Sequence, residues 1–140
     1  MTIKLSGAAT AIAPGTELLY EYVAQEDITE NEVVAKSETT RRVLKAQATT
    51  WDRMPAVGVA RETRTTGQTI KVEQFGVAEN ITRDADFGYD DKIFVSTNAG
   101  KATSTPPEGV GKIVQSLGRA INTSDIILEI DQTVLELQED

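Results

Sequence analysis

The stretch AVGVARETRTTGQTIKVEQFGV, residues 56–77, decides the fold. It opens with a short apolar run that contains a glycine, residues 56–60, and continues through a polar turn around Gly67. From Ile70 onward, apolar and charged side chains alternate. Alternation with a period of two places successive side chains on opposite faces of the backbone, which is typical of a half-buried strand. The stretch therefore predicts two short strands joined by a turn.

Most of the remaining chain shows the same pattern. Turn residues such as Asn98-Ala99-Gly100 separate short apolar runs, and no long helical pattern occurs after residue 26. Residues 18–23 also fit a helix that is N-capped by Thr16, but we favour a strand there because β-branched and aromatic residues dominate the strands expected later in the chain. The further strands that we expect are 33–35, 42–45, 93–95, 101–105, 110–117, 126–130 and 134–137. This pattern predicts an all-β fold, a small barrel or sandwich of short antiparallel strands.

Two halves of the sequence resemble each other at an offset of about 60 residues. Residues 32–46 resemble 92–105, since each has an apolar strand, a turn and a basic or Thr-rich return strand. Residues 56–77 resemble 109–134, since each has a glycine inside an apolar strand and then an alternating strand. One interpretation is a duplicated β-unit with copies at 32–77 and 92–134. The alternative is that β-hairpins share these features without duplication.

Length and composition limit the organisation and the partners. The 140 residues suit one domain, in which residues 17–140 form the β-rich part. Residues 1–16 offer few core residues, so we expect an extended N-terminal arm there. A formal net charge of −8 disfavours nucleic-acid binding. No apolar run approaches the roughly 18 residues of a membrane span, and no signal-peptide core is apparent, so we expect no membrane partner and no export by that route.

The side chains that most enzymes use are missing. The chain has no histidine and no cysteine, which excludes thiol nucleophiles, imidazole bases and zinc sites built on these ligands. Residues 109–112, Gly-Val-Gly-Lys, fail the phosphate-binding loop pattern, because Pro106 and Ile113 stand where Gly and Ser or Thr are required. We therefore expect no enzymatic activity and no cofactor.

The best metal candidate is the acidic stretch that contains Asp84, Asp86, Asp90 and Asp91. Alternating aspartates suit a hard cation such as Ca²⁺, but an EF-hand loop beginning at Asp84 would place Tyr89 and Val95 at its Gly and Glu positions. The EF-hand interpretation therefore fails. An irregular Ca²⁺ site and a solvated acidic turn remain as alternatives, and we favour the turn, with no bound metal.

Charge and aromatic residues indicate a candidate interface. Residues 36–64 carry seven basic and three acidic residues, a net charge of +4 inside an acidic chain. The same region holds the chain's one tryptophan, Trp51, beside Arg53 and Met54. Trp51 is either an interface anchor or a cap on one end of the core. The residues that we expect at an interface are Thr2, Ile3, Lys4, Leu5, Arg41, Arg42, Trp51, Arg53, Met54 and Arg64.

Four stretches together resemble the small capsid decoration, or cement, proteins of tailed bacteriophages. They are ITENEVVAKS at 28–37, MPAVGVARETRTTGQTIKVEQFGV at 54–77, DDKIFVSTNAGKATSTPP at 90–107, and GVGKIVQSLG at 109–118 with the alternating strand after it. Their order and spacing carry the resemblance. The acidic C-terminus and the long loop at 47–55 depart from the family pattern and leave the subgroup open.

The resemblance implies a function without catalysis. It implies a β-rich structural protein, made in the host cytoplasm, that binds the exterior of the capsid in the virion. The implied partners are the major capsid protein and further copies of the same chain in a homotrimer. The alternative from another class of protein is a β-domain that binds a small molecule or a glycan.

Overall fold

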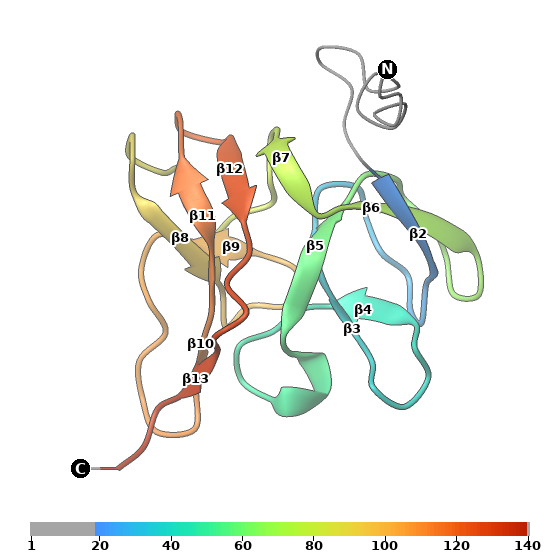
Figure 1. Ribbon diagram of the computed structural model, residues 1–140, viewed down its shortest axis with the longest axis horizontal. Coiled ribbons are helices and arrows are strands. Elements are labelled where there is room, and N and C mark those ends of the chain that lie inside the picture. The colour runs from blue at the N-terminus through green and yellow to red at the C-terminus, as the bar shows by residue number, and fades with distance from the viewer. Residues whose placement is uncertain (1–18, 140) are drawn as a thin grey trace, which may run out of the picture.

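The computed structural model describes residues 19–139 and shows an all-β protein built from antiparallel sheets (Figure 1). The first large sheet has the order β2-β6-β5-β3-β4 and the second has the order β7-β12-β11-β8-β9. A small sheet pairs β10 with β13. The predicted all-β class is confirmed. The expected arm at residues 1–16, and with it Thr2, Ile3, Lys4 and Leu5, lies outside the described residues.

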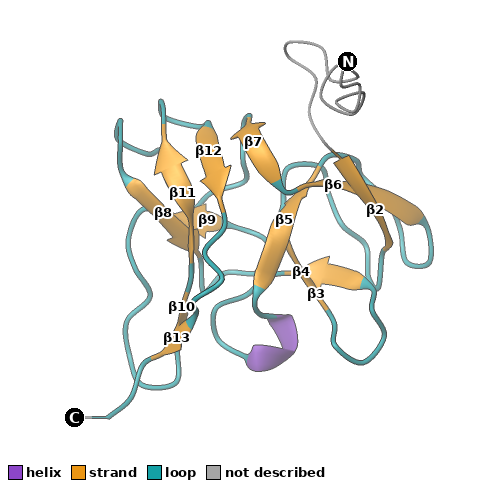
Figure 2. Cartoon of the chain, in the orientation of Figure 1, coloured by secondary structure: helices purple, strands orange, loops and turns teal. Residues whose placement is uncertain are grey.

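The strands of the first sheet are β2 (Leu19–Val23), β3 (Val33–Lys36), β4 (Val43–Lys45), β5 (Ala56–Ala60) and β6 (Thr69–Glu73). Those of the second sheet are β7 (Phe75–Ala78), β8 (Lys92–Val95), β9 (Ala102–Thr103), β11 (Ser116–Ala120) and β12 (Ile126–Glu129). The small sheet pairs β10 (Ile113–Val114) with β13 (Leu135–Glu136). The helical element within residues 19–139 is a single 3₁₀ turn, η1 (Trp51–Arg53), shown in purple in Figure 2. No helix in this range is long and apolar enough to cross a membrane.

The sandwich interpretation holds, because the two large sheets share one apolar core. Val33, Ala35 and Val59 of the first sheet belong to the same buried cluster as Ile93 and Ile126 of the second. The sheets lie side by side and neither forms a closed barrel (Figure 1). Burying this apolar surface is the main term that stabilises the fold.

A second, smaller core lies on the other face of the first sheet. It contains Val34, Val43, Ile70 and Val72 and is covered by the chain around Ile28. Because both faces of β3 are therefore buried, three consecutive residues of this strand are fully apolar and the alternation seen in β6 is absent. This explains why the sequence around 33–35 shows a continuous apolar run.

Both large sheets have the same topology. When the five strands of each sheet are numbered in chain order, both run 1-5-4-2-3. The ladder between the second and fourth strands has a register shift in each sheet. Gly58 and Gly118, which lie 60 residues apart, occupy matching places in the fourth strands. The topological units span residues 19–73 and 75–129, so each begins one strand earlier than the sequence units 32–77 and 92–134.

Two expected strands are divided in the structure. The alternating stretch 69–77 breaks at Gln74, where the chain leaves the first sheet and enters the second as β7. The stretch 110–117 becomes β10 and the start of β11, with Gln115 between them. Residues 19–23 form strand β2, so the strand was the correct choice over the helix there.

Candidate interaction surface

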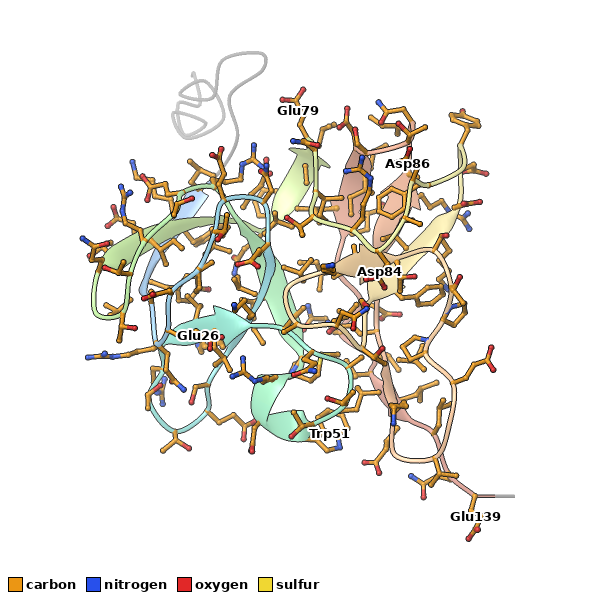
Figure 3. The ribbon with its side chains drawn as sticks, turned by 180° about the vertical axis from the view of Figure 1, so that it is seen from behind. Glu26, Trp51, Glu79, Asp84, Asp86 and Glu139 are labelled. Atoms are coloured by element: carbon orange, nitrogen blue, oxygen red, sulfur yellow. The ribbon has the colours of Figure 1, made fainter. Side chains whose placement is uncertain are left out.

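The 3₁₀ turn η1 forms because its local hydrogen bonds are satisfied. The side-chain oxygen of Thr50 accepts a bond from the backbone N–H of Asp52 at 3.2 Å, which caps the start of the turn. The N–H groups of Arg53 and Met54 donate to the carbonyls of Thr50 and Trp51 at 3.1 and 3.3 Å. The turn immediately precedes β5 and therefore places Trp51 at one end of the first sheet, as Figure 3 shows from behind.

Trp51 is half exposed but fixed in place. Trp51 is 48% exposed and belongs to neither buried cluster. The indole Nε1 donates a hydrogen bond of 2.6 Å to Oε1 of Glu136 on β13. Trp51 is therefore not one of the buried core residues. An exposed, oriented indole has the properties of an interface anchor, because little conformational freedom remains to be lost on contact.

Arg53 fastens the turn to the first sheet. Its guanidinium donates to both carboxylate oxygens of Glu26, at 2.7 and 3.3 Å, and to the carbonyl of Lys45 at 3.1 Å. Partial burial would raise the pKa of Glu26, but the bonds from Arg53 and from the Lys45 N–H, together with the Arg53 charge, hold this pKa below its ordinary value. Arg53 therefore positions η1 and presents little free charge.

The turn between β3 and β4 lies beside η1. It is closed by backbone bonds between Ser37 and Arg42 and between Arg41 and Ser37, at 2.8 and 2.9 Å. Arg41 has a φ of 63°, in the left-handed region. Both arginines are exposed, and neither forms an ion pair with a carboxylate of residues 19–139. Their positive charge is available to a partner.

A groove of about 430 Å³ separates η1 from this turn. We call it the Trp51 groove, and it is lined by Gln25, Ser37, Glu38, Thr39, Thr40, Leu44, Trp51, Asp52 and Arg53. The groove has one large aromatic wall and mostly polar walls elsewhere. Arg41 and Arg42 come directly after its lining residues in the turn without contributing to it.

The structure places two predicted interface residues elsewhere. Met54 is only 3% exposed and lies in the core shared by the two large sheets, so its predicted place at an interface is wrong. Arg64 lies beyond the opposite end of β5 from η1, where it pairs with Glu62 at 3.0 Å. The basic segment 36–64 therefore does not form one basic face. Its Arg53 and Arg61 are also paired with acids, Glu26 and Glu73.

Sequence reasoning missed the residues that position this surface. Glu136 and Glu26 are far from Trp51 and Arg53 along the chain, and nothing in their local pattern links them. The sequence does show an excess of acidic residues outside residues 36–64. This excess indicates that the basic residues have acidic partners, but it does not indicate which acids these are.

The four aspartates of the predicted acidic stretch contact separate partners. Asp84 accepts bonds from Ser96 at 2.6 Å and Asn98 at 3.0 Å, whereas Asp86 pairs with Arg83 at 3.0 Å. Asp91 accepts a bond of 2.7 Å from the N–H of Gly88, and Asp90 approaches Arg119 at 3.8 Å. Each of these four carboxylates therefore has a polar or charged partner within the protein. Within residues 19–139, no three carboxylates converge in a way that would hold a metal ion.

Comparison with known proteins adds no relative to this picture: no protein-family model and no curated protein sequence matches the chain.

Proposed function

We propose that this chain is a structural virion protein that binds the outer surface of a phage capsid and stabilises it. The proposal begins from the resemblance of four sequence stretches to capsid decoration proteins. The all-β sandwich is compatible with such a role. A net charge of −8 also suits a protein displayed at high density on a particle, because like-charge repulsion limits aggregation.

The observation that carries the proposal is the half-exposed indole of Trp51. The hydrogen bond to Glu136 orients the indole. The ion pair between Arg53 and Glu26 holds η1, the turn that contains Trp51, against the first sheet. Aromatic anchors of this kind provide a large share of the binding energy in protein interfaces. Arg41 and Arg42 beside the groove would orient the approach to an acidic partner surface and mainly raise the association rate.

The proposed partners are the major capsid protein and further copies of this chain. A decoration protein gains avidity when it contacts several capsid subunits at once, so we propose a homotrimer on the particle. Electron microscopy of the particle with which the chain co-purifies tests both parts. The expected result is density on the capsid exterior grouped in threes. Dispersed single copies would contradict the trimer, and absence of the chain from the exterior would contradict the function.

A second candidate function is favoured by the Trp51 groove. Its volume of about 430 Å³ lies within the size range of small-ligand pockets, and it combines one aromatic wall with polar side chains that can form hydrogen bonds. A β-domain that binds a glycan or another small molecule would use Trp51 for stacking and Gln25, Glu38 and Asp52 for hydrogen bonds.

The two functions are separated by one pair of measurements. Native mass spectrometry of the purified chain, with and without a panel of mono- and oligosaccharides, detects a ligand directly. A saturable sugar complex that is lost in Trp51→Phe and Asp52→Ala variants, together with no particle binding, would favour the glycan function. Particle binding without a sugar complex would favour the decoration function.

A further inference from the structure

Four exposed apolar side chains form a patch where the two large sheets meet. They are Tyr20, Phe75, Val77 and Ile127, with exposed fractions of 40%, 47%, 41% and 42%. The rings of Tyr20 and Phe75 meet edge to face with centroids 6.2 Å apart. Val77 and Ile127 are direct partners in the β7–β12 ladder, so their side chains are neighbours on one face. We call these four residues the β7 patch.

Strand β7, which carries two of these four residues, also has an open edge. Within residues 19–139, β7 pairs on one side with β12, and no other strand pairs with its second side. An apolar edge strand with unpaired backbone groups is a template for another strand, and native proteins usually cover or blunt such edges. The β7 patch and this edge together require an extended occupant with apolar side chains on one face.

The open edge of β7 faces the side from which the N-terminal segment enters. A groove lined by Val57, Gln74 and Glu129 lies beside the junction between β6 and β7. Strands β5 and β12 therefore lie on the same side of this junction. Strand β2 pairs with the opposite side of β6, and Leu19 pairs with Glu73 just before the chain continues into β7 (Figure 1). Leu19, the first described residue, therefore lies close to the β7 patch.

The first six residues have the pattern that this edge requires. In Met1-Thr-Ile-Lys-Leu-Ser6, Ile3 and Leu5 alternate with three polar residues, which matches the two-residue spacing of the exposed side chains of Phe75 and Val77.

The connecting length allows the segment to return to its own sheet. Residues 7–18 span up to about 40 Å when extended, and a β7 of four residues is only about 13 Å long. Gly7 and the Pro14-Gly15 pair supply turn residues in this connection. A tether this short holds the segment at an effective concentration on the order of 1 mM near β7, which favours its own chain over a second copy.

We propose that residues 2–6 add to β7 of the same chain as an antiparallel strand, with Leu5 beside Phe75 and Ile3 beside Val77. The antiparallel direction brings Ser6 to the Phe75 end of β7, close to Leu19, so that residues 7–18 close a compact loop. The segment covers the apolar edge in the free protein. This inference concerns the isolated chain and stands apart from the proposed function.

The absence of native cysteine makes disulfide trapping a clean test. Two double variants of the full chain, Leu5→Cys with Phe75→Cys and Ile3→Cys with Val77→Cys, are oxidised at low protein concentration. Each is expected to form an intrachain disulfide, mapped by peptide mass spectrometry. The control pair, Leu5→Cys with Leu135→Cys, uses an exposed apolar residue on β13, far from β7 (Figure 1). The matched pairs should close at least about tenfold faster than the control.

A second measurement needs no introduced cysteine. Hydrogen exchange in the peptide that covers Phe75–Ala78 is compared between the full chain and a chain lacking residues 1–6. Docking predicts at least about tenfold faster exchange of the edge amides after truncation, because their hydrogen-bond partners are removed. Equal closure rates for matched and control pairs, predominantly interchain disulfides, or unchanged exchange would each overturn the proposal.

Discussion

The side-chain amide of Gln115 pairs with both backbone groups of Ala56, as a neighbouring strand would. Its Oε1 accepts from the Ala56 N–H at 2.7 Å, and its Nε2 donates to the Ala56 carbonyl at 3.2 Å. The same Nε2 also donates to the carbonyl of Asp131 at 3.1 Å. Gln115 is only 2% exposed and lies between β10 and β11, so one amide connects the first sheet to the second.

Gln115→Ala should therefore destabilise the fold by about 2–4 kcal/mol. The substitution leaves two buried backbone groups of Ala56 without partners and adds a small cavity. Urea unfolding measures the free energy. The matched control is Gln132→Ala, which removes an exposed glutamine near the same segment and should change stability by less than about 0.5 kcal/mol. Equal effects of the two substitutions would show that the amide does not join the sheets.

Two glycines in matching strands should both resist substitution. A Cβ at Gly58 would overlap the carbonyl oxygen of Glu73, and a Cβ at Gly118 would overlap that of Ile127. Gly118 also has a φ of 142°, which side chains rarely adopt. We expect Gly58→Ala and Gly118→Ala each to cost about 3 kcal/mol or more, since backbone atoms must move. Gly67→Ala, at φ 88° with open space around it, should cost about 1–2 kcal/mol. Thermal unfolding of the three variants gives the comparison.

Local patterns predicted the strands well where one face is buried and the other is exposed. The alternation in β6 and the turn at Asn98-Ala99-Gly100 both have counterparts in the structure. The break at Gln74 is marked in the sequence only by a change of phase, since the apolar residues are Ile70 and Val72 before it and Phe75 and Val77 after it. The stretch is divided because its two halves join different sheets: β6 lies between β2 and β5, whereas β7 pairs with β12. Which sheet each half joins depends on contacts with residues far away in sequence.

Local sequence patterns also predicted only part of the candidate surface. The composition around Trp51 indicated an anchor, and the exposed indole agrees with that description. Met54, three residues later, has the opposite environment, since the extended backbone at Met54 leads directly into buried β5. A side chain's direction after an irregular turn depends on the turn's dihedral angles, which composition does not encode. The neutralisation of Arg53 by Glu26 also required the tertiary fold.

The ion pair of Glu26 and Arg53 should make stability depend on pH in the acidic range. Because the folded-state pKa of Glu26 lies below its ordinary value of 4.5, the unfolded chain binds the proton first as the pH falls. The pair's contribution is complete well above pH 4.5 and is lost as the pH falls through the folded pKa. Glu26→Gln should cost about 1 kcal/mol at pH 7, and less at pH 3. Urea unfolding at both pH values, with the exposed Glu139→Gln as control, measures the difference.

Trp51→Ala should weaken particle association far more than Arg41→Ala. Truncating an aromatic anchor typically costs about 2 kcal/mol or more, a loss of roughly 30-fold in affinity, whereas a charge at the rim acts mainly on the association rate. Because the indole is 48% exposed, Trp51→Ala should lower the stability of the isolated chain by only about 1 kcal/mol. A core position would lose about 3–5 kcal/mol. Tyr89→Ala, which removes an aromatic side chain at a residue that is 81% exposed, is the matched control and should leave association unchanged. Association is measured by co-sedimentation with particles stripped of the native chain, and stability by thermal unfolding of the same variants. Normal association of Trp51→Ala would show that the interface lies elsewhere, and the β7 patch would then be the next surface to test.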